Sequence, residues 1–250
     1  MSRHKNDMYG KIDSRSEADP GVLPPIPAAT VLLLRQAEAG LEVLMLKKNS
    51  KISFGGMWVF PGGKIDAADA ADGMSGEEFD EAAARNAAAR EAQEEAGVDL
   101  DPEVFAYFAH WTPPPGPQKR FTTWFFAADV TGKQLDVDID DGEIKDSAWL
   151  SPATALERHA KGEIEFVPPT WVTIYHLAQL KDVAPAMERF SSEAPRVYAT
   201  HVGKAADGNR VAMWYGDAGY DAWDPDVDGA RHRLVMAPDG FVFENDVEVY

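Results

Sequence analysis

Apolar runs and alternating positions predict a set of β-strands along the first part of the chain. The run from Ile26 to Leu34 is typical of a buried strand, and residues 41–47 alternate as a second strand. Only a short turn at residues 37–40 separates the two, so they are expected to form a hairpin. Further strands are expected at residues 58–60, 104–111, 120–128 and 148–150.

Three segments predict helices. The longest is the Ala- and Glu-rich stretch from Ser75 to Ala96, in which Ser75 and Glu78 match a capping box and Gly97 supplies a left-handed stop. A second helix is expected after Ser151, which would cap it, with a Pro at the first helical position. The third covers residues 168–180, where apolar side chains recur at helical spacing.

Changes of composition divide the chain into three parts. Residues 1–24 are polar and end in a Pro-rich segment, which predicts a mobile tail and linker. Residues 25–185 carry the elements above and would form the main domain. Residues 186–250 alternate short β-like runs with Asp- and Gly-containing turns, which predicts a small antiparallel β extension. The extension would cover a site, form a homodimer or only stabilise the fold, and its His201 and His232 are expected to be structural.

The overall composition limits the choice of partners and location. The formal net charge of −18 argues against binding to nucleic acid or to an anionic membrane, which require a basic surface. The chain has no Cys, so disulfides, thiolate metal sites and a Cys nucleophile are excluded. No apolar run approaches the length of a membrane span, and no signal segment is found, so a cytoplasmic protein is expected.

Three carboxylates near the end of the longest predicted helix form a candidate metal site. Glu91, Glu94 and Glu95 are at i, i+3 and i+4, so their side chains share one face of the helix. In a desolvated cleft these like charges repel one another by several kcal/mol at an effective dielectric of about 20. A divalent cation removes that repulsion, and oxygen ligands without Cys or His favour Mg²⁺ or Mn²⁺. The alternative interpretation is a solvated face on a good helix-forming segment.

A Gly-Gly loop precedes the acidic helix. Residues 58–60 lead into Pro61-Gly62-Gly63, where the two glycines let main-chain groups approach a ligand or metal closely. Three lysines before the loop are either ordinary strand-end residues or phosphate contacts: Lys47, Lys48 and Lys51.

The loop and the helix together resemble the Nudix box of the Nudix hydrolases. The match runs from Arg90 to Val98 as Arg-Glu-x-x-Glu-Glu-x-Gly-Val, with Ala92 as a small version of an aliphatic position. An insertion around residues 67–75 separates the two halves of the box, and Ala82 stands where the family has its first Glu. The resemblance implies an α/β/α sandwich with a mixed sheet and metal-dependent hydrolysis of a diphosphate bond.

The resemblance also implies how Mg²⁺ or Mn²⁺ would be bound. Arg90 would orient Glu91 or a neighbouring carboxylate. The implied metal ligands are Glu91, Glu94, Glu95 and a carbonyl group of Gly62 or Gly63.

An acidic residue ahead of a late Trp often adds a ligand or a base in this family. Glu143 stands six residues before Trp149 and takes that position, with Asp140 and Asp141 as fallback candidates. The general base is then either Glu94 or Glu143, and the sequence leaves both open.

Two further segments resemble one branch of the family. Residues 111–126, which begin Trp-Thr-Pro-Pro, and residues 166–171, Phe-Val-Pro-Pro-Thr-Trp, are similar to the branch that contains the peroxisomal coenzyme A diphosphatase, called nucleoside diphosphate-linked moiety X motif 19-like. This resemblance implies a small-molecule nucleoside diphosphate derivative as substrate, namely coenzyme A or an acyl-coenzyme A. The expected phosphate contacts are Lys47, Lys119 and Arg120.

The chain departs from the branch in the upstream coenzyme A signature. Met45 stands at its Thr, while Lys47 and Ile52 stand at its two Arg positions. Two alternatives therefore stay open: a pyrophosphatase for ADP-ribose or a nucleotide sugar, and, in a different class, a non-catalytic nucleotide-binding regulatory module.

Overall fold

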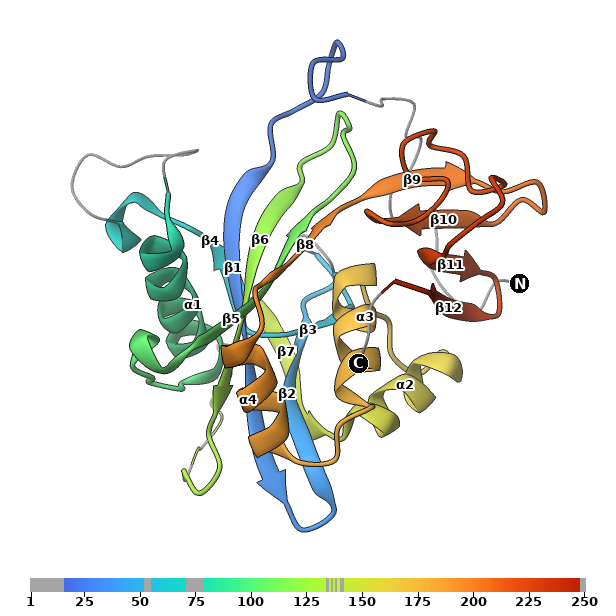
Figure 1. Ribbon diagram of the computed structural model, residues 1–250. Coiled ribbons are helices and arrows are strands. Elements are labelled where there is room, and N and C mark those ends of the chain that lie inside the picture. Colours follow the sequence, from blue (N-terminus) through green and yellow to red (C-terminus); the bar gives the residue numbers. More distant parts are fainter. Residues whose placement is uncertain are drawn as a thin grey trace.

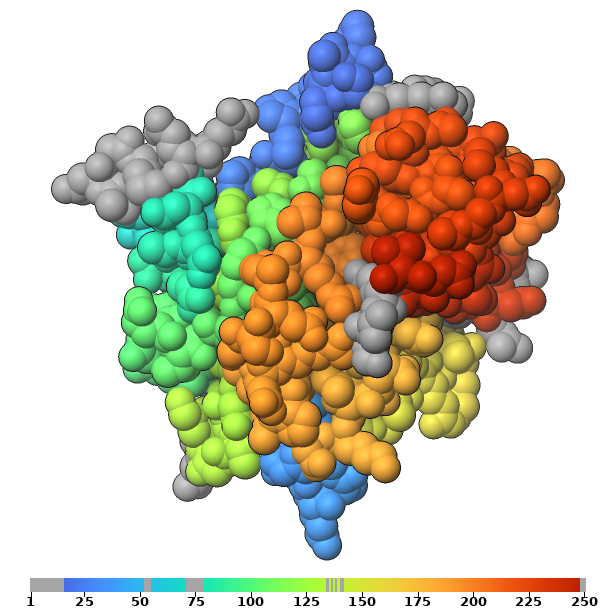
Figure 2. All heavy atoms as spheres, in the orientation of Figure 1, coloured from blue at the N-terminus to red at the C-terminus, as the bar shows by residue number. Residues whose placement is uncertain are grey.

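The computed structural model describes residues 16–51, 55–70, 79–133, 135, 137, 139 and 142–247. A central sheet has helix α1 (Glu81–Ala96) on one side and helices α2 (Pro152–Ala160), α3 (Pro168–Leu177) and α4 (Val183–Ser192) on the other (Figure 1). A second, smaller sheet forms a lobe of its own, drawn in orange and red in Figure 2. These layers confirm the expected α/β/α sandwich with a mixed sheet and an antiparallel C-terminal extension.

Over the described ranges, the large sheet has eight strands in the order β3-β2-β1-β6-β5-β8, with β4 paired to β1 and β7 paired to β2. These strands are β1 (Ile26–Ala37), β2 (Gly40–Lys48), β3 (Trp58–Val59), β4 (Gly62–Lys64), β5 (Ala106–Thr112), β6 (Phe121–Asp129), β7 (Ile144–Leu150) and β8 (Arg196–Ala199). The small sheet contains β9 (His201–Lys204), β10 (Arg210–Met213), β11 (His232–Ala237) and β12 (Gly240–Asn245).

Strand β1 organises the large sheet because it has different partners along one edge. Its other edge pairs in parallel with β6 from residue 26 to residue 34. On the divided edge, residues 28–30 pair with β4 and residues 34–37 pair with β2. The sheet therefore splits beside the middle of β1, and the Gly-Gly loop lies at the split.

The apolar run of β1 is explained by burial on both faces of the sheet. Ala29, Val31 and Leu33 pack towards α1, whereas Leu32 and Leu34 pack in the cluster that contains α2, α3 and α4. Helix α1 meets the sheet through alanines that are at most 1% exposed: Ala83, Ala84, Ala87, Ala88 and Ala92. Small side chains at these positions let the helix axis lie close to the sheet, which brings its acidic end to the split.

Helix α1 begins later than the sequence indicated. Its N-cap is Asp80, an extended residue whose carboxylate accepts a hydrogen bond from the Ala83 N–H at 2.9 Å. The predicted helix included Phe79 and Asp80, which are not helical, so that part of the prediction is wrong. The predicted capping box of Ser75 and Glu78 lies outside the described residues. The stop is confirmed, because Gly97 has a φ of 67° and its N–H bonds to helix carbonyls.

The other elements follow the sequence pattern with a few differences. Ser151 caps α2 as expected, and the third predicted helix is α3, which ends at Leu177. Val104 belongs to the 3-10 turn η3 (Pro102–Val104) instead of the following strand. Helix α4 was not predicted, although Val183, Ala186, Met187 and Phe190 recur at helical spacing. Among the described residues, no helix is long and apolar enough to cross a membrane.

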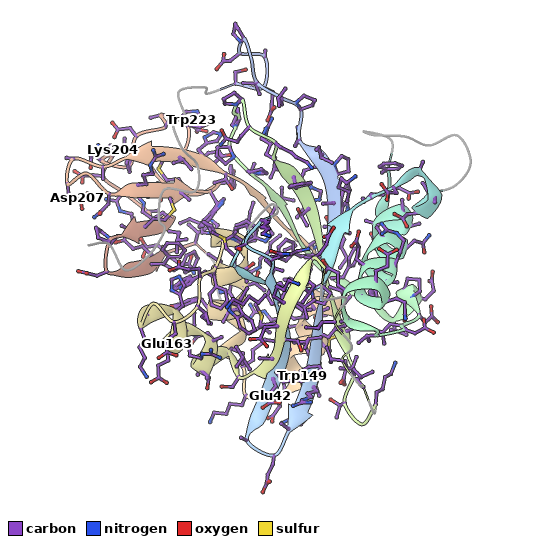
Figure 3. All side chains as sticks on the ribbon, turned by 180° about the vertical axis from the view of Figure 1, so that it is seen from behind. Glu42, Trp149, Glu163, Lys204, Asp207 and Trp223 are labelled. Atoms are coloured by element: carbon purple, nitrogen blue, oxygen red, sulfur yellow. The ribbon has the colours of Figure 1, made fainter. Side chains whose placement is uncertain are left out.

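The C-terminal extension contains one strand that joins the large sheet. Strand β8 pairs in parallel with the edge strand β5, and β9 to β12 then form the small sheet. A buried ion pair between Arg233 and Asp217, at 2.6 Å, ties β11 to the loop after β10. Lys204, Asp207 and Trp223 mark the outer side of this sheet, away from α1 (Figure 3). The division of the chain into domains at residues 24 and 185 stays a prediction.

The tight packing of α1 gives a first testable prediction. Ala88→Leu should destabilise the protein by about 1–3 kcal/mol, because the added atoms have no space between the helix and the sheet. Ala82→Leu on the exposed face is the matched control and should change stability by less than about 0.5 kcal/mol. Urea denaturation with a metal chelator present measures both, and equal stability of the two variants would contradict the packing.

Candidate active site

The Gly-Gly loop is fixed against β1 by hydrogen bonds to the main-chain carbonyl of Pro61. The Pro61 carbonyl accepts bonds from the Val31 N–H at 3.0 Å and from the Thr30 hydroxyl at 2.7 Å. A Cβ atom on Gly62 would lie 2.5 Å from the Ala29 carbonyl oxygen, and one on Gly63 would lie 2.2 Å from a carboxylate oxygen of Glu91. Gly62 is therefore required by the close approach of the β1 backbone, whereas a side chain at residue 63 would displace the Glu91 carboxylate from the loop.

The three acids of α1 face this loop at different depths. The Glu95 side chain is only 5% exposed and accepts a hydrogen bond from the Gly62 N–H at 3.0 Å. Glu91 is also largely buried, whereas the side chain of Glu94 is 58% exposed. Burial raises the pKa of Glu91 and that of Glu95, because desolvation disfavours their charged forms.

Arg90 forms ion pairs with two of these acids, and its role in orienting them stays a prediction. Its guanidinium lies 3.0 Å from a carboxylate oxygen of Glu91 and 3.1 Å from one of Glu94. Asp69 holds the other side of the same guanidinium through two hydrogen bonds of 2.9 Å. The bonds to Asp69 are the main cause that raises the pKa of Arg90, and the Lys64 carbonyl accepts a further bond at 3.0 Å.

The sequence interpretation did not single out Asp69. It lies in the turn η1 (Ala67–Asp69), within the segment that was treated as an insertion, and it is buried. Its carboxylate accepts a bond from the Asp66 N–H at 2.8 Å, and its carbonyl accepts one from the Asn86 side chain at 2.9 Å. The Asp66-x-x-Asp69 pattern is a capping box and was the available signal, but nothing in the pattern identifies Arg90 as its partner.

Glu143 reaches the site from the start of β7. The Glu143 carbonyl accepts a bond from the Asn49 N–H at 2.7 Å, and the Asn49 side chain bonds to the Gly142 carbonyl at 2.8 Å. At the other end of β7, Trp149 lies under the Arg35 guanidinium at 4.2 Å, beside Glu42 (Figure 3). Asp140 and Asp141, the fallback candidates, lie outside the described residues.

A lysine joins the two groups of acids. The Lys48 ammonium pairs with the Glu95 carboxylate and lies 3.6 Å from a carboxylate oxygen of Glu143. The sequence interpretation preferred the neighbouring Lys47, but it is Lys48 that lines the cavity described below. A bulge between these two residues interrupts the pairing of β2 with β7. No pattern in the sequence predicts this bulge.

The two other expected phosphate contacts have defined positions at the opposite wall. Arg120 is buried, and its guanidinium donates to the carbonyls of Leu23 and Pro113 and pairs with Glu17. The Lys119 ammonium lies 5.1 Å from the centre of the Phe121 ring. Both residues line the cavity. Their role as phosphate contacts stays a prediction.

Most of the charged groups of the site border one cavity of about 640 Å³. The charged part is lined by the acids of α1, the Gly-Gly loop, Lys48 and Glu143. Strands β1 and β6 continue the wall into a less polar part, which has the following residues: Trp111, Pro113, Pro114, Phe125, Val167, Pro168, Pro169 and Thr200. The volume is in the range of sites for drug-sized ligands, about 300–1,000 Å³.

The donor set has the chemistry of a site for hard divalent cations. Four carboxylates and the main chain of a Gly-Gly loop meet beside the split sheet. Across the described ranges, no three Asp, Glu or His side chains have the geometry to hold a metal ion. In the described structure these acids pair with Arg90 and Lys48. The donors fit Mg²⁺ or Mn²⁺ in kind.

The fold and the site define a class of protein, an α/β/α hydrolase with a carboxylate-rich helix held against a Gly-Gly loop. The family model described as NUDIX domain matches residues 24–170, more than half of the chain. The chain therefore belongs to the NUDIX domain family and is a Nudix hydrolase that acts on a diphosphate bond.

One solved structure supports the same fold, and two further ones are similar at a lower level. The Nudix hydrolase from Alicyclobacillus acidocaldarius is 21% identical, with a TM-score of 0.56 over 68% of this chain and 99% of that one. A C. elegans Ap4A hydrolase is 16% identical, with a TM-score of 0.43 over 62% and 96%. The NUDIX domain of Shewanella oneidensis NrtR, solved with ADP ribose, is 16% identical, with a TM-score of 0.43 over 64% and 91%. No curated protein matches this chain in sequence.

The contact between Asp69 and Arg90 gives a second prediction. Asp69→Asn should lower kcat at least about tenfold, because an amide cannot accept both guanidinium bonds and Arg90 then loses its orientation towards Glu91 and Glu94. Asp66→Asn should have a smaller effect, since the Asp66 carboxylate is exposed and lies 3.8 Å from Arg90. Steady-state hydrolysis of the nucleoside diphosphate derivative that the enzyme cleaves fastest measures both. Equal losses in the two variants would contradict the assigned role.

Proposed function

We propose that this enzyme hydrolyses the diphosphate bond of coenzyme A or an acyl-coenzyme A. The observation that carries the proposal is a single cavity with an acidic part at one side and a wall of proline, aromatic and aliphatic side chains at the other. The acidic part suits a diphosphate that arrives with metal ions, and the apolar wall suits a long, weakly polar group such as a pantetheine or acyl chain. The two Pro-Pro segments that resemble the coenzyme A branch both line that wall.

The metal ligands in this proposal are those that the sequence implied. Mg²⁺ or Mn²⁺ would be held by Glu91, Glu94, Glu95 and a carbonyl of the Gly-Gly loop, with Glu143 at the rim. A bound divalent cation neutralises phosphate charge and lowers the pKa of a bound water.

The residues of this chain have distinct tasks in the reaction. Water attacks one phosphorus of the diphosphate, a new P–O bond forms, and the bond from that phosphorus to the bridging oxygen breaks. A carboxylate takes the proton of the water, and both candidates from the sequence, Glu94 and Glu143, have accessible side chains, which are 58% and 64% exposed. Arg90 positions Glu91 and Glu94 during this step, because Asp69 prevents its guanidinium from turning away.

A second candidate is hydrolysis of ADP-ribose or a nucleotide sugar. The position of Lys47 favours it, since this residue occupies an Arg position of the coenzyme A signature and is not among the residues that line the cavity. The same acids and the same attack on a phosphorus serve either substrate. Only the group in the apolar part of the cavity changes.

A substrate panel with Mg²⁺ and with Mn²⁺ tests the proposal. The panel holds coenzyme A, an acyl-coenzyme A, ADP-ribose, NADH, a nucleotide sugar and nucleoside triphosphates, with products separated by chromatography. Selective release of 3′,5′-ADP and a phosphopantetheine is the expected result. Preference for ADP-ribose or a sugar nucleotide would replace the first substrate by the second, and cleavage of neither class would refute both.

Two substitutions of exposed acids, one on α1 and one far from the site, test the mechanism in the same panel. Glu94→Gln should abolish metal-dependent turnover and leave the fold intact, because the side chain is largely exposed and its loss creates no cavity. Glu38→Gln, an exposed acid in the turn between β1 and β2, should keep full turnover. Circular dichroism checks the fold, and near-wild-type turnover of Glu94→Gln would remove this residue from the mechanism.

A further inference from the structure

Lys48 is placed as the cationic partner of acids from two separate elements. It ends β2, and residues 44 and 46 of that strand pack on the α1 side of the sheet, so the Lys48 side chain emerges on the same side. The ammonium meets Glu95 of α1 and approaches Glu143 at the start of β7. Its side chain is 11% exposed and lines the cavity.

The two cations of the site differ in how firmly they are held. Arg90 donates to Asp69 through two bonds and to the Lys64 carbonyl, in addition to its contacts with the acids of α1. Within the described part of the chain, the Lys48 ammonium pairs with Glu95 and Glu143 alone, and Glu143 is largely solvent-exposed. An ammonium on a flexible four-carbon chain can exchange partners where a clamped guanidinium cannot.

We propose that Lys48 is a built-in counter-ion that a divalent cation displaces from Glu95 and Glu143. The inference rests on the proposed metal-dependent function. It states that Lys48 and the metal ion compete for the same carboxylates. An ammonium and a divalent cation on one carboxylate repel each other, so both cannot keep the present contacts. The displaced ammonium stays at the cavity, where a phosphate group of the substrate is its natural new partner.

The exchange couples metal binding to phosphate binding. Without substrate, a cation that binds must break the contact of Lys48 with Glu95, which weakens its affinity. With a phosphate group in the cavity, the released ammonium gains a partner and that loss is offset. By linkage, the phosphate ligand then tightens metal binding, and the metal tightens phosphate binding by the same factor.

The exchange also fits the burial of Glu95. A carboxylate that is 5% exposed requires a cation in the metal-free protein, because a buried unpaired charge is strongly unfavourable. Lys48 satisfies this need before the metal arrives, so the helix and the loop can fold in their final positions. The same feature that stabilises the metal-free protein therefore lowers its affinity for metal.

Calorimetric titration of Mn²⁺ into the full chain tests the proposal, with and without AMP, a mononucleotide that contains no diphosphate bond. Lys48→Met should bind Mn²⁺ at least fivefold tighter than the wild type when AMP is absent. AMP should tighten Mn²⁺ binding to the wild type and have a smaller effect on Lys48→Met. Lys64→Met is the matched control, since Lys64 lines the same cavity but its ammonium approaches Asp66 at 3.9 Å, and it should bind Mn²⁺ as the wild type does.

Thermal unfolding separates this role from a purely structural one. In a metal chelator, Lys48→Met should unfold at a lower temperature than the wild type, because Glu95 loses its partner. Mn²⁺ should remove that difference. A deficit of the same size with and without Mn²⁺ would mean that Lys48 only stabilises the fold and would overturn the proposal. Lys48→Gln carries the same expectations and keeps the test valid if the methionine variant does not fold.

The outcomes also distinguish this proposal from the proposed function. Equal or weaker Mn²⁺ binding by Lys48→Met, with hydrolysis by the wild type intact, would overturn only the role of Lys48. No Mn²⁺ binding by the wild type, together with no cleavage in the substrate panel, would overturn the proposed function and this inference with it.

Discussion

The contact between the acidic end of α1 and the Gly-Gly loop is the constraint on which the rest of the structure depends. Glu95 bonds to the Gly62 N–H, and Glu91 occupies the space that a side chain on residue 63 would fill. The contact requires a helix that lies close to the sheet, which the buried alanines of α1 provide. It also requires a loop held at fixed depth, which the bonds between Pro61 and β1 provide. The split sheet is the place where both conditions are met.

The cost of this contact is the burial of carboxylates, and the surrounding residues reduce it. Arg90 serves the acids of α1 and is itself fixed by Asp69, so its position is set before any ligand binds. Lys48 pairs with Glu95, and no residue holds its ammonium in the way that Asp69 holds Arg90 among the described residues. One cation is therefore a rigid part of the site and the other is exchangeable. Under the proposed exchange, this asymmetry couples the binding of a metal ion to the binding of a phosphate group.

The sequence predicted the parts of the site that lie close together along the chain. The spacing of Glu91, Glu94 and Glu95 places them on one face of a helix, and Gly97 ends it. Asp69 and Lys48 were not predicted as partners of this helix, because their contacts join residues far apart in the sequence, through a 3-10 turn and through the end of β2 on the α1 side of the sheet. The start of α1 was placed too early because Ser75 and Glu78 match a capping box, whereas Asp80 is the N-cap. The pairing of β8 with β5 joins segments with no shared pattern.

The two ends of the cavity come from different parts of the chain. The reacting part of the cavity comes from residues 62–95 with Lys48 and Glu143, all within the matched NUDIX domain. The apolar part combines β5, β6 and the start of α3 with Thr200, which follows β8 and lies beyond residue 170. Thr200 also accepts a hydrogen bond from the Trp214 indole N–H at 3.1 Å, so the small sheet supports that wall. The C-terminal extension thus takes part in shaping the less polar end of the cavity, the end that the proposed function assigns to the group beyond the diphosphate.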